Sequence, residues 1–459
     1  MSKRAILLLS FIVASIFSSA QGLGNGYISG PMLGYCEARE VLIWLEVNRG
    51  VNNAAIRYWE KGNISSVKVH TYDDELGKDF NPIKFKIGNL KMNTVYEYQV
   101  ILNKITLKFS YPLQFKTKEL WQWRESAPDF SFLVGSCTYI NDKEYDRPGT
   151  PYGLSTDIFK SMANTKADFM IWGGDNTYLR EADWYSEFGI RYRYSHTRKE
   201  ANLQRLLSVR PNFAIWDDHD YGPNNSDASY DFKYQTFNTF TEYWGNANYG
   251  PYEEDIDGIY SKMEWSDCEF YLMDNRFNRS PNELPATSNN QFNESKKYLG
   301  EEQLEWLKYS LLSSKATFKF ILGGNQWLNE NNEGECFRHY PYEFNELVNF
   351  IKQQKITGVV FISGDRHLSE MIKVDLAGMY SLYDITSSPL TSTARNIREK
   401  KEFNNPLRVN GKLLMEPNYI RFNVAGKQNA RTINIECLDA KGDLKWDYTL
   451  SESDLDFNF

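Results

Sequence analysis

Three acids and one histidine follow directly on an apolar segment near the middle of the chain. Residues 215–220 read Ile-Trp-Asp-Asp-His-Asp, and residues 212–216 have the composition of a buried strand. A carboxylate leaves water only when it is paired or bound to a metal, so three of them around one imidazole indicate a binding site. A single acid at a strand end more often caps a helix or closes a turn. That simpler interpretation is weakened because the same pattern recurs elsewhere.

Four other strand-like segments also end on polar side chains. These segments are 130–134, 169–172, 318–322 and 359–362. The polar side chains that follow them are Ser136, Cys137, Asp175, Asn176, Tyr178, Asn325, Gln326, Asp365, Arg366 and His367. Because the carboxyl ends of strands in an α/β domain open onto one crevice, we expect these groups to meet the acids of 217–220 there.

The expected cluster has the ligand types of a centre with more than one metal ion. Carboxylate and amide oxygens suit calcium or magnesium, whereas a thiolate, a phenolate and an imidazole together suit a transition metal such as iron. Glycines that permit a close backbone approach precede these side chains. They are Gly135, Gly173, Gly174, Gly323, Gly324 and Gly364.

Several candidates also have an ordinary structural interpretation. Cys137 has the alternative of a buried small apolar residue, and Tyr178 that of a packed aromatic. Asn224 and Asn225 follow the central motif, where they either bind calcium or substrate or simply form a loop. Arg366 is a candidate to clamp phosphate oxygens.

Basic side chains elsewhere offer weaker candidates for contacts with an anion. Arg191, with Arg193 and Arg198, can serve as a phosphate ligand, although a solvated helix face is the simpler interpretation for all three. Arg191 is retained as a substrate-binding candidate. His196 and His339 are interpreted as surface or substrate-pocket residues.

The elements that must position these groups fall into two parts. From residue 26 to 118 the chain has short alternating runs separated by Gly and Asn, without a sustained helical period. The runs are 41–47, 54–59, 67–72, 83–87, 95–102 and 113–117. This pattern is typical of a small antiparallel sandwich that resembles a fibronectin type III module, and we assign it to residues 21–124.

Residues 125–459 have the alternation of strands and helices that indicates an α/β domain. Helices are predicted near 154–164, 201–207, 230–243, 301–311 and 341–354, and 278–295 is predicted to be a surface loop. Strands dominate again at 381–386, 419–424, 431–438 and 444–450. We expect them to complete the second sheet of the same domain.

Composition and the first residues predict an exported protein. The formal net charge is −8, so no broad basic field is available for nucleic acid or an anionic membrane. Residues 1–20 have the form of a secretory signal peptide, with Lys3 and Arg4, an apolar run and a small-residue end. No long apolar run follows, and we expect a periplasmic or secreted location.

Five cysteines are present, an odd number for a chain in an oxidising compartment. The pairing among Cys36, Cys268, Cys336 and Cys437 stays open, as does the oligomeric state. Cys137 is the one we expect to take part in chemistry.

The motifs together resemble the PhoD-type alkaline phosphatases, a branch of the calcineurin-like metallophosphoesterases. The resemblance covers about residues 129–390. It rests on Ser136-Cys137, Gly174-Asp175 with Tyr178, the run 216–220, the run Ser363-Gly364-Asp365-Arg366-His367, and the later run 386–390. It implies two facing mixed β-sheets flanked by helices, preceded here by the small all-β sandwich. It also implies Fe³⁺ and Ca²⁺ as cofactors, with other divalent metals as alternatives.

The resemblance also implies roles for single residues. Asp175 would bridge two metals, with Asp218 on the second ion. Cys137, Tyr178, Asp365 and His367 would surround the iron. Asn325 or Gln326 is a weaker candidate ligand, because other metallophosphoesterases place a histidine near this point. His219 would face the scissile phosphate, Asp220 would orient its ring, and Arg366 would assist. Asp217 is expected to support the loop.

The resulting expectation is an exported hydrolase of phosphate monoesters, in which a metal-bound hydroxide attacks phosphorus and His219 acts as the general acid. Two alternatives remain at this stage. The first is a phosphodiesterase that acts on nucleotide, phospholipid or polymer substrates with the same site. The second is an exported binding protein without catalytic activity, in which the metals are structural.

Overall fold

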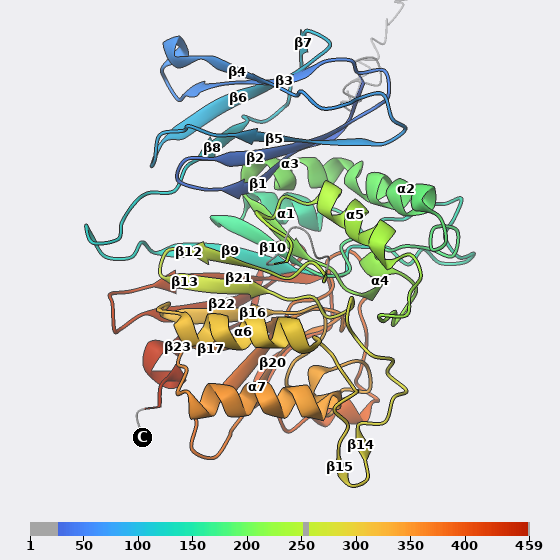
Figure 1. The fold of residues 1–459 in the computed structure, drawn as a ribbon, viewed down its shortest axis with the longest axis vertical. Helices are drawn as coiled ribbons and strands as arrows, with labels where there is room; N and C mark the ends of the chain where they lie inside the picture. Colours follow the sequence, from blue (N-terminus) through green and yellow to red (C-terminus); the bar gives the residue numbers. More distant parts are fainter. Residues whose placement is uncertain (1–25, 251–256, 458–459) are drawn as a thin grey trace, which may run out of the picture.

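The computed structural model describes residues 26–250 and 257–457 of the chain. The predicted signal peptide, residues 1–20, lies outside the described residues. The described parts stack in layers along the long axis of the molecule, with the N-terminal strands at one end (Figure 1).

The N-terminal strands form two sheets that pack face to face. The first sheet has the order β1 (Tyr27–Cys36), β2 (Val41–Val47) and β5 (Asn81–Ile87). The second has the order β4 (Lys68–Thr71), β3 (Ala54–Glu60), β6 (Val95–Leu102) and β7 (Ile105–Thr106), with β8 (Gln114–Lys116) on β6. Buried and partly exposed residues alternate along β6, which is the pattern of a half-buried strand.

Strand β1 was not anticipated from the sequence. Gly30, Pro31 and Gly34 interrupt its alternation, and its pairing with β2 contains register shifts. Glycine and proline weaken a strand pattern because one has no side chain to pack and the other cannot donate to the ladder. Gly34 lies against Gly245, where an added Cβ would meet the Gly245 backbone oxygen at 2.7 Å. This contact brings the sandwich close to the rest of the chain.

The larger part of the chain contains two mixed sheets. The six-stranded sheet has the order β11 (Asn212–Ile215), β10 (Phe169–Gly173), β9 (Phe130–Gly135), β21 (Asn418–Ala425), β22 (Thr432–Asp439) and β23 (Leu444–Ser451). The seven-stranded sheet has the order β12 (Ser261–Trp265), β13 (Cys268–Leu272), β16 (Phe318–Leu322), β17 (Val359–Ser363), β19 (Leu382–Thr386), β18 (Ser369–Val374) and β20 (Arg408–Leu414). A small hairpin joins β14 (Thr287–Ser288) and β15 (Gln291–Phe292).

The C-terminal strands differ from the prediction. Of the four strands predicted there, only β19 joins the second sheet, whereas β21, β22 and β23 extend the first sheet through antiparallel pairing of β21 with β9. In that ladder Phe422 lies opposite Phe132. The periodicity of a strand fixes which side chains face inward but carries no information on which distant strand lies beside it.

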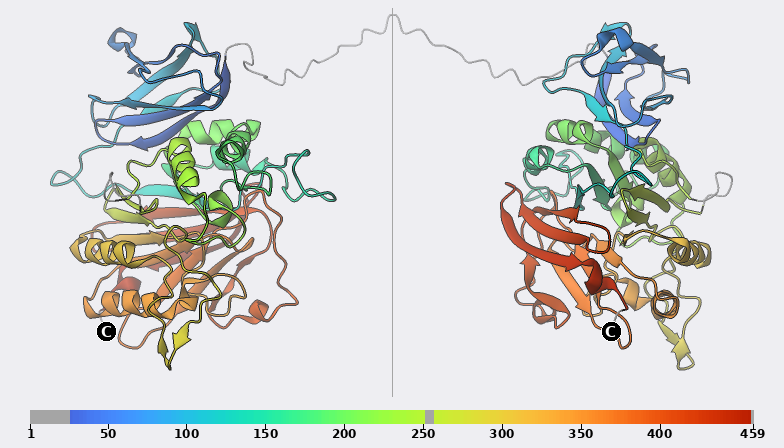
Figure 2. Two further views of the ribbon diagram at one scale, coloured as in Figure 1. Left: turned by 45° about the vertical axis from the view of Figure 1, so that its right-hand side comes forward. Right: turned by 90° about the vertical axis from the view of Figure 1, so that its left-hand side faces the viewer.

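Helices cover both outer faces of the paired sheets (Figures 1 and 2). Those between the sandwich and the six-stranded sheet are α1 (Ile158–Asn164), α2 (Glu187–Arg198), α3 (Ala201–Val209) and α5 (Lys233–Tyr243). The helices α6 (Glu301–Ser313) and α7 (Pro341–Gln353) lie against the seven-stranded sheet, and α4 (Asp218–Tyr221) is a single turn. Single 3₁₀ turns are η1 (Ile64–Ser66), η2 (Phe337–His339), η3 (Lys401–Asn404) and η4 (Glu452–Leu455).

Helix α2 does not present a solvated basic face. Arg193 and Arg198 are buried, with 1% and 3% exposure. Arg193 Nε donates to Asp183 Oδ2 over 2.8 Å, and the Arg198 guanidinium lies 3.8 Å from the Trp244 ring centroid. The prediction was wrong because α2 is enclosed between the sandwich and the sheet, an arrangement that the local sequence does not indicate.

The two sheets meet in an aromatic core centred on Phe132. Its ring stacks on Phe422 at 4.6 Å and on Phe169 at 5.1 Å within the six-stranded sheet. Across the interface it meets Phe270 edge to face at 5.0 Å and Phe320 at 5.3 Å. Such geometries add to the stabilisation from apolar burial. This core holds the strand ends of both sheets in a fixed relation.

All five cysteines are buried free thiols. Within residues 26–250 and 257–457, no helix combines the length and apolar character needed to cross a bilayer.

Replacing Phe132 by Ala should lower the free energy of unfolding by about 3–5 kcal/mol, because it removes a fully buried ring from the contact between the sheets. Denaturant unfolding followed by tryptophan fluorescence measures the change. Trp123→Ala is the control, since this ring is fully exposed and its loss should shift stability by less than about 0.5 kcal/mol. Equal effects of the two substitutions would contradict the assignment of the core.

Candidate metal centre

Polar groups from both sheets meet at the carboxyl ends of their strands, as predicted from the sequence. Cys137 follows β9, Asp175 follows β10 and Asp218 follows β11 in the six-stranded sheet. Asp365 and His367 follow β17 of the seven-stranded sheet. Strands β9, β10 and β11 run parallel to one another, and β17 runs parallel to β16 and β19, so within each sheet their carboxyl ends lie on the same edge.

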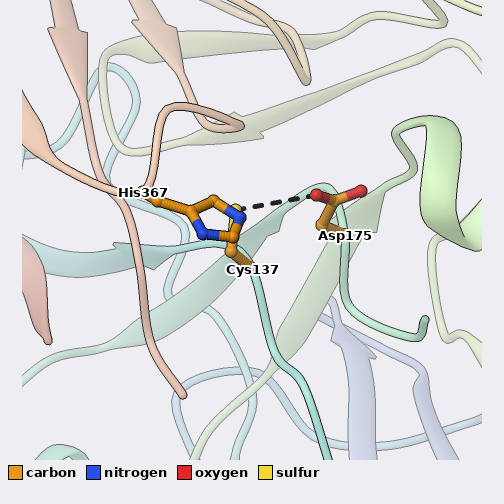
Figure 3. A group of neighbouring side chains, drawn as sticks. All are labelled: Cys137, Asp175 and His367. Atoms are coloured by element: carbon orange, nitrogen blue, oxygen red, sulfur yellow. Dashed lines mark hydrogen bonds between the residues drawn. The ribbon is translucent and has the colours of Figure 1, made fainter. Parts of the chain in front are cut away.

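Asp175 is common to three groups of possible metal ligands. The groups are Cys137 with Asp175 and His367, Asp175 with Asp218 and His219, and Asp175 with Asp217 and Asp365. Within each group the ligand atoms lie within 4.8 Å of one another. Figure 3 shows the first group, whose members converge from three separate segments. Asp175 therefore occupies the central position that the sequence analysis gave it.

Tyr178 lies inside this cluster. Its hydroxyl donates to Asp175 Oδ2 over 3.0 Å and lies 3.2 Å from His367 Nε2. Ser392 Oγ donates to the same hydroxyl over 3.1 Å, and Ser388 Oγ donates to Cys137 Sγ over 3.1 Å. The thiol and the phenol thus lie on the same side of Asp175 as the His367 imidazole.

Four of the predicted ligands have a left-handed backbone. The φ angles are 60° at Cys137, 53° at Asp175, 66° at Asp365 and 54° at His367. For residues with a Cβ this conformation costs on the order of 1–3 kcal/mol, and it concentrates at functional sites. The left-handed backbone changes the direction of the chain at each of these residues, close to the end of the preceding strand.

Close backbone packing accompanies these turns. A Cβ added to Gly364, next to Asp365, would lie 2.7 Å from the Gly173 backbone oxygen and 2.7 Å from Ser136 Oγ. Only glycine leaves room for the loops after β9, β10 and β17 to approach so closely. Gly364, one of the glycines predicted to permit a close backbone approach, therefore allows such an approach here.

Nearby cations compensate the charges of the cluster only in part, since Arg276 pairs with Asp217 and lies 3.8 Å from Asp218 Oδ1. Burial, followed by the charge of Asp218, raises the pKa of Asp175 well above its usual value. Burial, with Asp217, raises the pKa of Asp365 to about 7, and burial raises the pKa of Cys137 to about 12. Asp218 Oδ1 is buried without a hydrogen-bond partner. Bound cations would stabilise the ionised forms, so carboxylates, thiol, phenol and imidazole together fit a metal centre.

The orientation of His367 is fixed from outside the cluster. Its Nδ1 lies 2.8 Å from the Thr393 backbone oxygen and 3.2 Å from the Tyr152 hydroxyl. A proton on Nδ1 that is donated to Thr393 leaves the lone pair on Nε2, which faces Tyr178. Outer contacts of this kind are typical of metal-binding histidines.

His219 lies on the open side of the cluster. Its ring stacks on Tyr178 at 4.4 Å, and its backbone N–H donates to Asp175 Oδ1 over 3.2 Å. Burial lowers the pKa of His219, while the charge of Asp218 opposes the shift.

Asp220 does not orient the His219 ring. Its Oδ1 accepts from the backbone N–H groups of Asn176 and Thr177, and its Oδ2 accepts from that of Asp217. Asp220 therefore ties the loop after β10 to the loop after β11. The prediction was wrong because adjacency along the chain does not give contact when the intervening turn points the two side chains apart.

Asn325 lies behind the cluster, among buried arginines. Its Oδ1 accepts from Arg279 Nη1 over 2.7 Å and from Arg276 Nη2 over 3.2 Å, and its Nδ2 donates to Asp217 Oδ2 over 2.9 Å. Both lone pairs of the amide oxygen are thus engaged by cations, which does not fit a metal ligand. Asp217 in turn accepts from Arg276 Nε over 2.6 Å.

The sequence analysis missed this supporting network. It consists of Asn275, Arg276, Arg279 and Glu335, all buried. Arg276 Nη2 lies 2.5 Å from Glu335 Oε2. The signal was present, because Asp274-Asn275-Arg276 follows a sixth strand, β13, just as the other polar runs follow theirs.

A cavity of about 590 Å³ opens onto the cluster. Its lining residues are Tyr152, Asp175, Asp218, His219, Asn224, Asn225, Asn282, Lys296, Glu333, Gly334, Glu335, His339, Tyr340, Asp365, Arg366, His367, Thr393 and Arg395. Asn224, Asn225 and Arg366 are thus at the cavity, as predicted, and the Asn225 N–H donates to Asp218 Oδ2 over 2.7 Å. His339 also lines it.

Arg191 is not among the lining residues. Its Nε donates to Glu187 Oε1 and its Nη2 to Glu242 Oε1, both over 3.0 Å. The proposed role in substrate binding was wrong, because these acids on α2 and α5 engage the guanidinium away from the cavity. His196 also lies on α2, with Nε2 3.1 Å from the Asn141 backbone oxygen.

Comparisons with known proteins agree with this geometry. A family model described as PhoD-like phosphatase matches residues 132–429. Alkaline phosphatase D of Bacillus subtilis is 26% identical over 297 residues, which cover 55% of this chain and 48% of that protein. The chain thus spans about half the length of this curated relative.

Solved structures share the fold. A structure of PhoD matches with a TM-score of 0.74 and 17% identity, covering 95% of this chain and 92% of that one. A purple acid phosphatase from yellow lupin (Lupinus luteus) seeds matches with a TM-score of 0.63 and 11% identity, covering 93% of this chain and 75% of that one. Both the sandwich and the paired sheets lie within these matches.

Replacing Asp175 by Asn should lower the affinity for metal by at least about 100-fold, because one neutral amide replaces the oxygen atoms shared by all three ligand groups. Metal per chain after dialysis, measured by mass spectrometry, tests this. Asp157→Asn, an exposed acid beside α1, is the control and should retain the metal of the unaltered protein. A full complement of metal in Asp175→Asn would refute the central position of this carboxylate.

Proposed function

The chain belongs to the PhoD-like phosphatase family, and on that premise we propose that it is an exported, metal-dependent phosphatase that hydrolyses phosphate monoesters. The observation that carries the proposal is the position of Asp175, common to three ligand groups and lining an open cavity. A purely structural metal site is closed by a few ligands, whereas this one gathers more ligands than one ion needs and leaves space for a substrate.

The donor atoms support a division of the ligands between two ions. We assign Cys137, Tyr178, Asp365 and His367 to Fe³⁺ and Asp218 to a second ion, Ca²⁺, with Asp175 shared. A thiol, a phenol and an imidazole suit iron, whereas carboxylate oxygens suit calcium. Bound cations would neutralise phosphate charge and lower the pKa of a coordinated water.

The chain itself supplies the proton for the leaving group. His219 lines the cavity, and its ring is held against Tyr178 while its backbone is tied to Asp175. We assign it the role of general acid, which donates a proton to the leaving oxygen as the bond to phosphorus breaks. Arg366, at the same cavity, offers N–H donors to the phosphoryl oxygens.

Asp217, Asp220 and Asn325 act on the site indirectly in this proposal. Asp220 joins the loops that carry Asp175 and Asp218, and Asn325 holds Asp217 through a hydrogen bond of 2.9 Å. Arg276 compensates the charge of Asp217 from the side opposite the cavity. These contacts restrict the motion of the loops, and preorganised loops favour catalysis.

A diesterase activity is the second candidate, because a cavity of about 590 Å³ is larger than a phosphate group requires. Turnover of a phosphate monoester and of the matched diester, measured on the same preparation, distinguishes the two activities. Retained folding but lost turnover after chelation would decide against a binding protein without catalytic activity.

Export and the division of the chain complete the proposal. We assign residues 1–20 to a signal peptide, residues 21–124 to a fibronectin-III-like sandwich and residues 125–459 to the catalytic domain. Lys3, Arg4 and the following apolar run support the first assignment.

Replacing His219 by Ala should lower kcat by roughly 10²- to 10⁴-fold, because the leaving oxygen then departs without a proton donor. The loss should be greatest for alcohols of high pKa and small for nitrophenolate. Steady-state kinetics with both kinds of ester, together with metal analysis, tests the role. His70→Ala, in the sandwich, is the control; unchanged turnover of alkyl esters by His219→Ala would exclude the assignment.

The assignment of Fe³⁺ predicts that the purified protein absorbs visible light. Tyrosinate or thiolate bound to Fe³⁺ should give the purified protein a visible absorption band that disappears in the double variant Tyr178→Phe, Cys137→Ala. Tyr309→Phe, at an exposed position on α6, should keep the band. A colourless, active protein that contains only zinc or calcium would refute the assignment.

A further inference from the structure

Glu402 is a buried acid with no role in the proposed metal centre. It lies in η3 and is 2% exposed. A carboxylate at such a position needs a cation close by, since its desolvation is otherwise very unfavourable. Arg366 Nη2 donates to Glu402 Oε2 over 2.5 Å, and Arg395 Nη2 lies 3.2 Å from Glu402 Oε1. One carboxylate therefore pairs with two guanidinium groups.

The turn that carries Glu402 is itself held in place. Arg408 Nη2 donates to the Glu402 backbone oxygen over 2.9 Å, and Arg408 Nη1 donates to that of Phe403 over 2.6 Å. The remaining Arg408 donor, Nε, bonds Glu370 Oε2 on β18 over 2.7 Å. The seven-stranded sheet thus fixes the position from which Glu402 reaches the two arginines.

Both arginines line the metal cavity. Arg366 stands between Asp365 and His367, and the Arg395 N–H donates to the His367 backbone oxygen over 2.7 Å. Arg366 is 3% exposed, lines the cavity, and has a buried Nε without a hydrogen-bond partner. Arg395 has another acid nearby, Glu333, but at 3.8 Å and with 46% side-chain exposure this pair is weak. Lys400 Nζ lies 3.9 Å from the same Glu333 carboxylate. Three cations, Arg366, Arg395 and Lys400, therefore face two acids, Glu402 and Glu333, which leaves a positive charge on this wall.

We propose that Arg395 is a further phosphate-binding residue and that Glu402 is the positioning residue that holds Arg366 and Arg395 as a pair against the substrate's phosphoryl oxygens. The inference rests on the proposed function for its substrate. Glu402 does not touch the substrate in this arrangement. It fixes the orientation of both planar guanidinium groups, which reduces the entropy lost when they bind an anion.

Binding of inorganic phosphate to the metal-loaded full chain tests the proposal. Isothermal calorimetry of Glu402→Gln and Arg395→Gln should each give a dissociation constant roughly 10- to 100-fold above that of the unaltered protein. KM for a monoester should rise with it, while kcat and metal content change far less. Glu436→Gln is the matched control, because it breaks a hydrogen bond of 2.5 Å between a glutamate and Arg421, remote from the cavity.

The double variant separates positioning from an independent effect. If Glu402 acts through the arginines, Arg395→Gln should weaken phosphate binding much less in the Glu402→Gln variant than in the unaltered protein. Additive losses, or unchanged phosphate affinity in either single variant, would overturn the proposal. If Glu402→Gln folds poorly, Arg395→Gln still decides the role of Arg395, because this side chain is only partly buried, with 34% exposure. Arg395→Lys should restore only part of the phosphate affinity.

If the unaltered protein is an active phosphatase and both single variants keep its phosphate affinity, this inference is refuted and the proposed function is not. An inactive unaltered protein that still binds phosphate through Arg395 would refute the proposed function alone.

Discussion

The repulsion among buried acids is the constraint on which this structure depends. Asp175 shares a group of ligand atoms within 4.8 Å of one another with Asp218, and another with Asp217 and Asp365. Asp175, Asp217 and Asp218 are buried, and Asp365 is partly buried. Arg276 compensates the group on one side only. In the absence of bound cations, protonation of some of these carboxylates relieves the repulsion. Burial raises the pKa values of Asp175 and Asp365, which favours their protonated forms. Bound cations would therefore stabilise the folded state.

The scaffold supplies the rigidity that keeps these groups together. Left-handed turns at four candidate ligands and the close approach of Gly364 to the neighbouring loops are unfavourable locally. They persist because the strands behind them are fixed by the aromatic contacts around Phe132 and by the bonds of Asp220 across two loops. The supporting contacts of Glu402 follow the same principle on the opposite wall, where a sheet-anchored turn holds two flexible side chains.

Much of the site could be predicted because its signals are local. Each ligand candidate follows an apolar run within a few residues, and the parallel arrangement of such runs brings their ends together. The convergence of Asp175, Asp218 and His367 could be predicted from this pattern alone. Their assignment as metal ligands came from the resemblance to the PhoD-type phosphatases and stays a prediction. Those for Asp220, Asn325 and Arg191 failed because their outcome depends on partners distant in the chain, namely the Asn176 backbone, Arg279 and Glu242. The prediction of the sheet to which β21 belongs failed for the same reason, because its neighbour β9 precedes it by almost 300 residues.

The pairing of β21 with β9 also bears on when the site can exist during synthesis. Strand β9 carries Cys137 at its end, and it lies between β10 and β21 in the finished sheet. Until residues 418–425 have left the ribosome, one edge of β9 has no hydrogen-bonding neighbour, and Phe132 lacks the ring of Phe422. A nascent chain that already contains every candidate metal ligand, up to His367, therefore still lacks the strand that closes the sheet beneath them. The sheet beneath the candidate metal centre is on this account completed only after residues 418–425 have been synthesised.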